Sequence, residues 1–344
     1  SGSTAVGGGA QATAANTAAF GQNAAATAAD ATALGENSTA SAADATAVGE
    51  SALATFAGST AVGSEASATE NHATAVGFQA TAQEDGSTAT GAGALAVQVD
   101  STALGSDSTA EGVDSTAVGA DANARADNST AMGADSEARS VNTLAVGNSA
   151  IANSIGATAS GANSLALREN SSAFGIAAQA TGADSTALGG NSSAAGANST
   201  AVGESATATL EGATALGADA QAIEANATAL GFAASATEDG AVAAGSNASA
   251  TALDASAFGA DATAAGFSSV AIGEDADARV DFTTAVGGNA EARSLNSTAL
   301  GQAAIANGEN STSSGANSLA LRDNSSAYGA NSRASGTAST ALGF

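Results

Sequence analysis

The sequence predicts an all-β solenoid built from coils of 14 residues, with two short strands in each coil. Three observations lead to this fold class. A glycine occurs at every fourteenth residue from Gly7 to Gly343, which gives 25 glycines in 25 possible positions. Small and large residues alternate twice between successive glycines, and no insertion interrupts the spacing. A short period kept over a whole chain is typical of a solenoid in which each coil contacts only its neighbours.

The composition also disagrees with an ordinary globular domain. Aromatic residues make up 3% of the 344 residues, so large side chains are too few for a normal core, yet a hydrophobic content of 44% is too high for a disordered polar chain. Alanine supplies most of that 44%, and we therefore expect a narrow interior. The net charge of −26 disfavours nucleic acid and anionic membranes as partners. No stretch approaches the roughly 20 apolar residues of a membrane span.

The first strand of each coil is predicted just before the glycine, as in residues 199–202 (Ser-Thr-Ala-Val). We call these glycines the period glycines and number each column of the repeat from them. Column −2 holds alanine in 24 of 25 coils, column −1 a large apolar residue in 21, and column −3 threonine in 18. Alternation of this kind indicates a strand rather than a helix. We expect column −2 to point into the coil, and columns −3 and −1 to point outward.

The second strand is predicted after the glycine, as in residues 206–209 (Ala-Thr-Ala-Thr). Column +5 is alanine in all 24 available places and is expected inside, whereas columns +4 and +6 vary freely and are expected in solvent. Turns separate the two strands. Column −5 is Gly, Asn or Asp in 21 of 25 places, which suits a backbone with positive φ.

The large residues of column −1 form an apolar stripe on the outside of the predicted roll. Leaving each side chain in water would forfeit about 1.5–3 kcal/mol, and monomers rarely expose so long an apolar surface. We therefore expect copies of the same chain to bury the stripe, although the pattern does not give their number. The predicted interface residues are Val6, Leu34, Val62, Leu104, Val118, Val146, Val202, Leu216, Ile272, Val286, Leu300 and Leu342.

A longer repeat of 154 residues, or 11 coils, runs through the chain. Residues 163–168 (Asn-Ser-Leu-Ala-Leu-Arg) return at 317–322, and Arg125 and Arg139 return as Arg279 and Arg293. We therefore predict one continuous array over residues 1–344 rather than two independent domains.

In the coils of Ser160 and Ser314, large residues move from column −1 to the second strand. Two interpretations stay open for them: they pack against a neighbouring chain or adjust the roll, or they contact a ligand. The candidate ligand-contact residues are Ile151, Leu165, Leu167, Arg168, Ile305, Leu319, Leu321 and Arg322.

The sequence gives no sign of catalytic, metal-binding or cofactor-binding residues. His72 is the single histidine and stands in a predicted turn, so it cannot form a triad or a metal cluster alone. Acidic pairs such as Glu84 with Asp85 also fall in predicted turns, with no cleft beside them. A polysaccharide-active β-helix enzyme would need larger coils and long loops. Binding of ice or a crystal surface through the threonine column is an alternative function, but those threonines share a face with the apolar stripe.

Two segments carry a resemblance to a known family. Residues 269–273 (Ser-Val-Ala-Ile-Gly) and 198–203 (Asn-Ser-Thr-Ala-Val-Gly) are each followed by Ala-x-Ala in columns +3 to +5. They resemble the head repeats of trimeric autotransporter adhesins, the YadA-like heads, and the resemblance covers the whole chain. It implies a single-stack, left-handed parallel β-roll, assembled as a homotrimer with column −1 facing the threefold axis.

The resemblance also implies a function. It suggests a non-enzymatic adhesin head at the surface of a Gram-negative bacterium. Such a head binds host matrix, host cells, abiotic surfaces or other bacteria through multivalent contacts on a rigid trimeric rod. No neck, coiled-coil stalk or membrane anchor is recognisable in this sequence. By the resemblance, attachment to the outer membrane would belong to a C-terminal anchor outside it.

Overall fold

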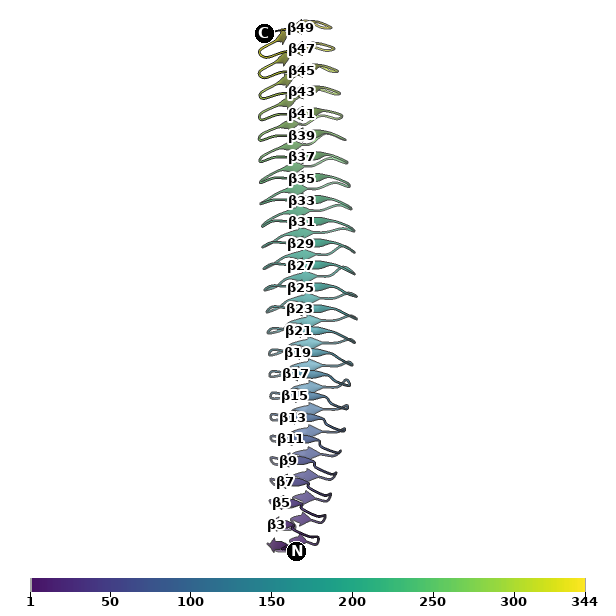
Figure 1. The fold of residues 1–344 in the computed structure, drawn as a ribbon, viewed down its shortest axis with the longest axis vertical. Coiled ribbons are helices and arrows are strands. Elements are labelled where there is room, and N and C mark those ends of the chain that lie inside the picture. The colour runs from purple at the N-terminus through teal and green to yellow at the C-terminus, as the bar shows by residue number, and fades with distance from the viewer. Residues whose placement is uncertain (1, 344) are drawn as a thin grey trace. The chain divides into compact units, whose positions relative to one another are not determined.

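The computed structural model describes residues 2–343, which fall into two compact units, Ser1–Ser171 and Ser172–Phe344. Each unit repeats one coil, made of a three-residue strand, a turn, a two-residue strand and a second turn (Figure 1). The prediction of an all-β chain with two short strands per 14-residue coil is confirmed. That the chain is one continuous array stays a prediction.

The strand boundaries follow the period without exception in the described residues. Three-residue strands have odd numbers and occupy columns −3 to −1, from β1 (Thr4–Val6) to β23 (Thr158–Ser160) in the first unit and from β25 (Ser172–Phe174) to β49 (Thr340–Leu342) in the second. Two-residue strands have even numbers and occupy columns +4 and +5. They run from β2 (Gln11–Ala12) to β24 (Leu165–Ala166) and from β26 (Gln179–Ala180) to β48 (Arg333–Ala334).

Within each unit, strands pair in parallel with the equivalent strands of the neighbouring coils. Strand β5 (Thr32–Leu34), for example, pairs with β7 (Thr46–Val48), so that Thr32 lies beside Thr46 and Leu34 beside Val48. Because the offset is always one period, each column of the sequence becomes a column of similar side chains in space. Within each unit the odd strands form one sheet and the even strands form another.

Four columns fill the interior between the two sheets. The alanines of columns −2 and +5 are buried as predicted, with Ala33 and Ala40 at 0% exposure. Columns −4 and +3, for which no direction was predicted, also point inward, as Ser59 and Ser38 show. Two sheets joined by such short turns leave space only for side chains of this size.

Serine is tolerated inside because its hydroxyl bonds to a turn carbonyl. Ser38 Oγ donates to Gly35 O at 2.9 Å, and Ser59 Oγ donates to Phe56 O at 2.7 Å. A buried hydroxyl without a partner costs about 1–3 kcal/mol. The hydroxyls of Ser164, Ser311 and Ser332 are buried without a hydrogen-bond partner. The first two belong to the coils of Ser160 and Ser314, which lack a large residue in column −1.

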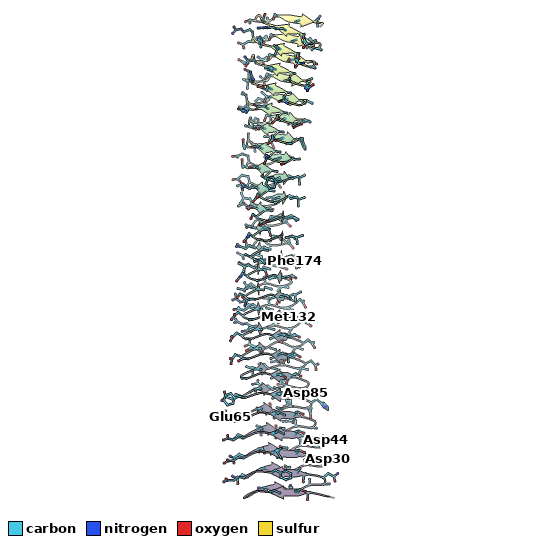
Figure 2. All side chains as sticks on the ribbon, turned by 90° about the vertical axis from the view of Figure 1, so that its left-hand side faces the viewer. Asp30, Asp44, Glu65, Asp85, Met132 and Phe174 are labelled. Atoms are coloured by element: carbon cyan, nitrogen blue, oxygen red, sulfur yellow. The ribbon has the colours of Figure 1, made fainter. Side chains whose placement is uncertain are left out.

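Each coil turns twice, and each turn contains a residue with positive φ. The expected one lies in column −5, as at Asp30 (φ 61°), and a second one lies in column +2, as at Glu65 (φ 59°). Figure 2 shows Glu65 at one edge of the first unit and Asp30 and Asp44 at the other edge. Asn, Asp and Gly tolerate this backbone conformation better than other residues, which explains the composition of both turns.

The period glycine is required by the close approach of successive coils. Gly21 has φ 137°, and a Cβ atom placed on it would lie 2.3 Å from the carbonyl oxygen of Gly35. The same geometry recurs at Gly203, where a Cβ would lie 2.4 Å from the Gly217 oxygen. A larger residue would have to push the next coil away, so the contact between coils fixes the glycine in the sequence.

Candidate functional site

The outer face of the odd-strand sheet carries the predicted apolar stripe in both units. We call its column −1 residues the seam; Met132 and Phe174 of the seam are labelled in Figure 2 and are 44% and 39% exposed. The predicted interface residues all lie in this column, and their outward direction is confirmed. The exposed ones are Val6, Leu34, Leu104, Leu216, Ile272, Leu300 and Leu342, and the less exposed ones are Val62, Val118, Val146, Val202 and Val286.

The candidate ligand-contact residues lie on the opposite face, the outer face of the even-strand sheet. In the first unit, Ile151 of β22 (Ile151–Ala152) pairs beside Leu165 of β24, and Leu167 follows one outward position later. In the second unit, Ile305 of β44 (Ile305–Ala306) pairs beside Leu319 of β46 (Leu319–Ala320). The structure thus brings the predicted aliphatic residues of each super-repeat together.

Arg168 and Arg322 stand in the turn that follows these leucines, and both side chains are exposed. The two turns are built in the same way. The backbone N–H of Arg168 donates to Ser171 Oγ, and that hydroxyl donates back to the Arg168 carbonyl at 2.7 Å. Arg322 makes the same pair of hydrogen bonds with Ser325. The backbone of each arginine is therefore held in place while its guanidinium group stays in solvent.

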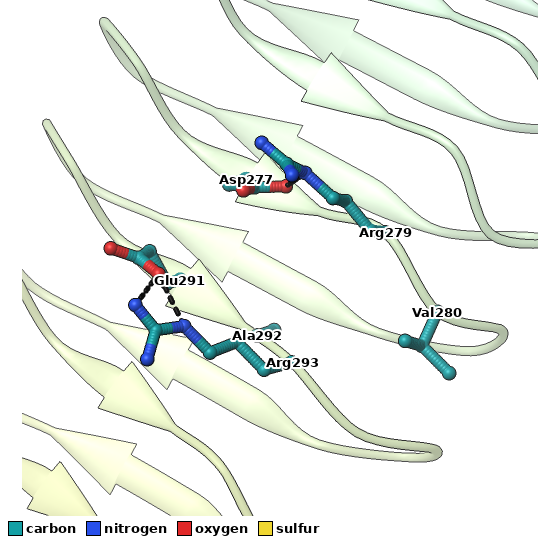
Figure 3. A pocket seen from close by; sticks show the side chains of 6 residues that line it. All are labelled: Asp277, Arg279, Val280, Glu291, Ala292 and Arg293. Atoms are coloured by element: carbon teal, nitrogen blue, oxygen red, sulfur yellow. Dashed lines mark hydrogen bonds and ion pairs between the residues drawn. The ribbon is translucent and has the colours of Figure 1, made fainter.

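Other arginines lie on the same face, next to the aliphatic residues. In the second unit, Arg279 Nε donates to Asp277 Oδ1 at 2.8 Å on β40 (Asp277–Ala278), and Arg293 pairs with Glu291 on β42 (Glu291–Ala292). Figure 3 shows the two pairs one coil apart, with Val280 at the turn. They line a shallow depression of about 520 Å³. Such pairs offer hydrogen-bond donors and acceptors to a polar ligand.

The first unit repeats this arrangement with one change. Arg139 pairs with Glu137, but Arg125 stands next to the amide of Asn123, whose oxygen accepts from Arg125 Nε and Nη2 at 3.2 Å once the amide is suitably oriented. We name the two surfaces the Arg–Leu patches. The first patch comprises Arg125, Arg139, Ile151, Leu165, Leu167 and Arg168. The second comprises Arg279, Arg293, Ile305, Leu319, Leu321 and Arg322, together with Arg333, which pairs beside Leu319.

A row of exposed apolar side chains in the second turn was not predicted from the sequence. In the second unit Leu253, Phe267, Phe282 and Leu295 are all 36–51% exposed, and the rings of Phe267 and Phe282 meet edge to face with centroids 5.2 Å apart. The 154-residue repeat could have revealed this row, because it keeps an apolar residue at equivalent turn positions. Val99 returns as Leu253, and Val141 returns as Leu295. The row was missed because its members are divided between columns +8 and +9.

The remaining chemistry-bearing residues are dispersed. His72 is exposed in a turn with φ 57°, and Glu84 and Asp85 are exposed in another turn, as expected for solvated turn residues. Across residues 2–343 no three His, Asp or Glu side chains gather into a group that could hold a metal ion. None of these residues belongs to a helix that could span a bilayer.

These features define a class of protein: a parallel β-solenoid of short coils with an apolar seam on one face. Sequence comparison matches the family described as "YadA head domain repeat (2 copies)" over most of the chain, and the chain belongs to this family. The matched residues are 1–24, 26–49, 40–66, 68–94, 96–122, 110–136, 169–192, 194–220, 222–248, 250–276, 264–290, 292–318 and 320–344. The resemblance inferred from residues 198–203 and 269–273 is thereby confirmed.

Two further comparisons add less. A crystal structure of the collagen-binding domain of the Yersinia adhesin YadA is similar at 25% identity, covering 52% of this chain and 68% of that one. Its TM-score is 0.17, which is too low to support an inference about this chain. A comparison with curated proteins gives no match. Family membership itself supports a non-enzymatic adhesin class.

Proposed function

We propose that this chain is the head of a bacterial surface adhesin, assembled as a homotrimer of left-handed rolls with the seams facing the threefold axis. The seam is the observation that carries the proposal. One column places large apolar side chains on one outer face of both units, with neighbours such as Leu188 and Val202 directly paired. Burying each against a partner copy contributes about 1.5–3 kcal/mol. Membership of the YadA head family supports the same assembly and role.

The repeated coils suit adhesion to extended or repetitive targets. Each coil presents the same backbone and a small variable surface, so one trimer offers many equivalent contact points. Weak contacts made together gain affinity through effective concentration. The targets we propose are extracellular matrix, host cells, abiotic surfaces or other bacteria, reached from the surface of a Gram-negative cell. The threonine ladder does not favour ice or crystal binding, because it alternates with the seam on one face.

Sedimentation of the purified chain tests the assembly, and a binding panel tests the role. We expect a species of three times the mass of 31.6 kDa at all concentrations above the dissociation constant. A chain that stays monomeric at high concentration would contradict the trimer. The trimer is then applied to matrix proteins, cultured cells, plastic and bacterial cells. Retention on none of these surfaces would contradict an adhesive head even if the trimer formed.

A further inference from the structure

We propose that the two Arg–Leu patches bind short acidic peptide segments that carry aliphatic side chains. The proposal deepens the adhesive role and rests on it, since it names the chemistry of the ligand. Both patches share one layout: exposed arginines at each end and aliphatic side chains between them. In the second unit Arg279 and Arg293 lie at one end, Ile305, Leu319 and Leu321 in the middle, and Arg322 and Arg333 at the other.

The charge distribution points to an acidic ligand. The chain has 33 acidic residues and seven arginines, and every arginine lies in one of the two patches. Three of them pair with a carboxylate of their own strand, and those pairs are the only ion pairs within residues 2–343. Arg125, Arg168, Arg322 and Arg333 are exposed, and no carboxylate of residues 2–343 lies at ion-pair distance from them. The arginines are thus gathered in two places on an otherwise acidic surface, and the four without an ion pair offer guanidinium groups to the carboxylates of a ligand.

The aliphatic residues point to a peptide rather than a sugar polymer. Elsewhere on this face, columns +4 and +6 hold mostly Ser, Thr, Ala and Gln. The interior does not need the leucines, because alanine, serine and, in three coils, threonine fill it. Ile305 and Leu319 lie side by side and half-buried, so they present a flat apolar strip to solvent. Aliphatic side chains of a peptide can bury against such a strip, whereas a polyanionic glycan presents mainly charged and hydroxyl groups to it.

The size of a patch sets the length of the ligand. Asp277 and Arg333 are separated by four successive strand pairings. At about 4.8 Å between strands this is roughly 19 Å, or about six residues of extended peptide. A fitting segment therefore carries carboxylates near both ends and two or three aliphatic residues between them. The patches face away from the seam, so the proposed trimer leaves them open.

Binding of a labelled synthetic peptide tests this proposal. The probe is Glu-Glu-Leu-Val-Leu-Glu-Glu, followed by fluorescence anisotropy with the whole chain at low salt. One variant carries Leu165→Ser, Leu167→Ser, Leu319→Ser and Leu321→Ser, and another carries Arg168→Gln, Arg322→Gln and Arg333→Gln. The matched control carries Leu53→Ser and Leu95→Ser, which alter lone leucines of column +4 outside the patches. All are first checked for wild-type sedimentation and circular dichroism.

We expect the leucine variant to bind about tenfold more weakly, as for the loss of central interface side chains. The arginine variant should lose both affinity and the salt dependence of binding, and the control should match wild type. Replacing Glu by Lys, or the aliphatic residues by Ser, should each abolish binding of the probe.

Three outcomes overturn the proposal. The first is that both patch variants bind the peptide as tightly as wild type, and the second is that the control loses as much affinity as the patch variants. The third is that the patches bind heparin or phosphatidylserine vesicles and not the peptide. Patch-dependent association of trimers without peptide binding would instead identify a second copy as the occupant. In all of these cases the proposed function is still supported if the chain forms a trimer and adheres to the panel of surfaces. A monomeric or non-adherent chain contradicts the proposed function itself.

Discussion

The two outer faces of each coil follow different rules. The face of the odd strands repeats a large apolar residue in column −1, and this column departs from the pattern in only four coils, those of Thr90, Ser160, Ala244 and Ser314. Threonine fills column −3 of the same face in 18 of 25 coils. The face of the even strands changes residue at almost every coil and gathers its arginines into the two Arg–Leu patches. A surface that repeats one residue type suits a partner with the same period, whereas a freely varying surface suits recognition. The difference separates assembly from binding within a single coil.

Charged residues on the seam should have the largest effect. Leu188→Asp, Val202→Asp and Leu216→Asp together remove roughly 5–9 kcal/mol of apolar burial per chain and bury carboxylates instead. We expect the trimer to dissociate in a sedimentation experiment. The matched control places aspartate on the other face of the same coils, through Ser193→Asp, Thr207→Asp and Gln221→Asp, and should stay assembled. Dissociation of both variants would contradict the inference that only the seam face mediates assembly.

A second, smaller effect concerns the end of the seam strand, where successive coils come closest. At Gly287 φ is 130° and an added Cβ would meet the Gly301 carbonyl carbon at 2.6 Å, whereas at Gly288 the nearest atom is 3.8 Å away. Gly287→Ala should lower the free energy of unfolding by roughly 3 kcal/mol, and Gly288→Ala should leave it within about 0.5 kcal/mol. Urea unfolding of the two variants measures this, and similar midpoints would show that the coils can separate without cost.

The smallest effect is expected in the interior between the two sheets. It tests whether coils that lack a seam residue also have less favourable hydrogen bonding in their interior. Ser192 and Ser164 occupy the same column, but Ser192 Oγ donates to Gly189 O at 2.8 Å while Ser164 Oγ has no partner. Ser192→Ala should destabilise by about 1 kcal/mol, and Ser164→Ala should stabilise by a similar amount. Thermal unfolding gives both values. A loss of stability at both positions would mean that the Ser164 hydroxyl has a hydrogen-bond partner in solution, such as a bound water.

Much of the fold could be read from the sequence, because each column has one dominant physical constraint. The alanines of column −2 predicted the interior, and Gly, Asn and Asp in column −5 predicted a turn with positive φ. The inward direction of columns −4 and +3 was harder to predict, since serine is common on surfaces and only its bond to a turn carbonyl makes it suitable inside. The second positive-φ position was missed for a related reason. Column +2 includes residues such as Glu65 and Ala177, whose types do not favour positive φ.

The candidate site was only partly predictable. The leucines of the Arg–Leu patches were visible because two coils lose their seam residue just where the leucines appear. That Arg279 and Arg293 pair with carboxylates of their own strands, and that Arg322 and Arg333 do not, depends on side-chain geometry that the repeat does not contain. The exposed row around Phe267 and Phe282 was hidden because turn residues of one surface come from different columns.

The glycine-to-glycine contact also governs how such a chain can change in length. Within each unit every coil meets the next through the same backbone atoms, so inserting or deleting one whole coil there leaves the flanking coils with unchanged neighbours. An insertion of any other length would place a side chain where only hydrogen fits and would rotate the columns out of line. Length can therefore vary in steps of one coil, while the two faces keep their separate roles at every size.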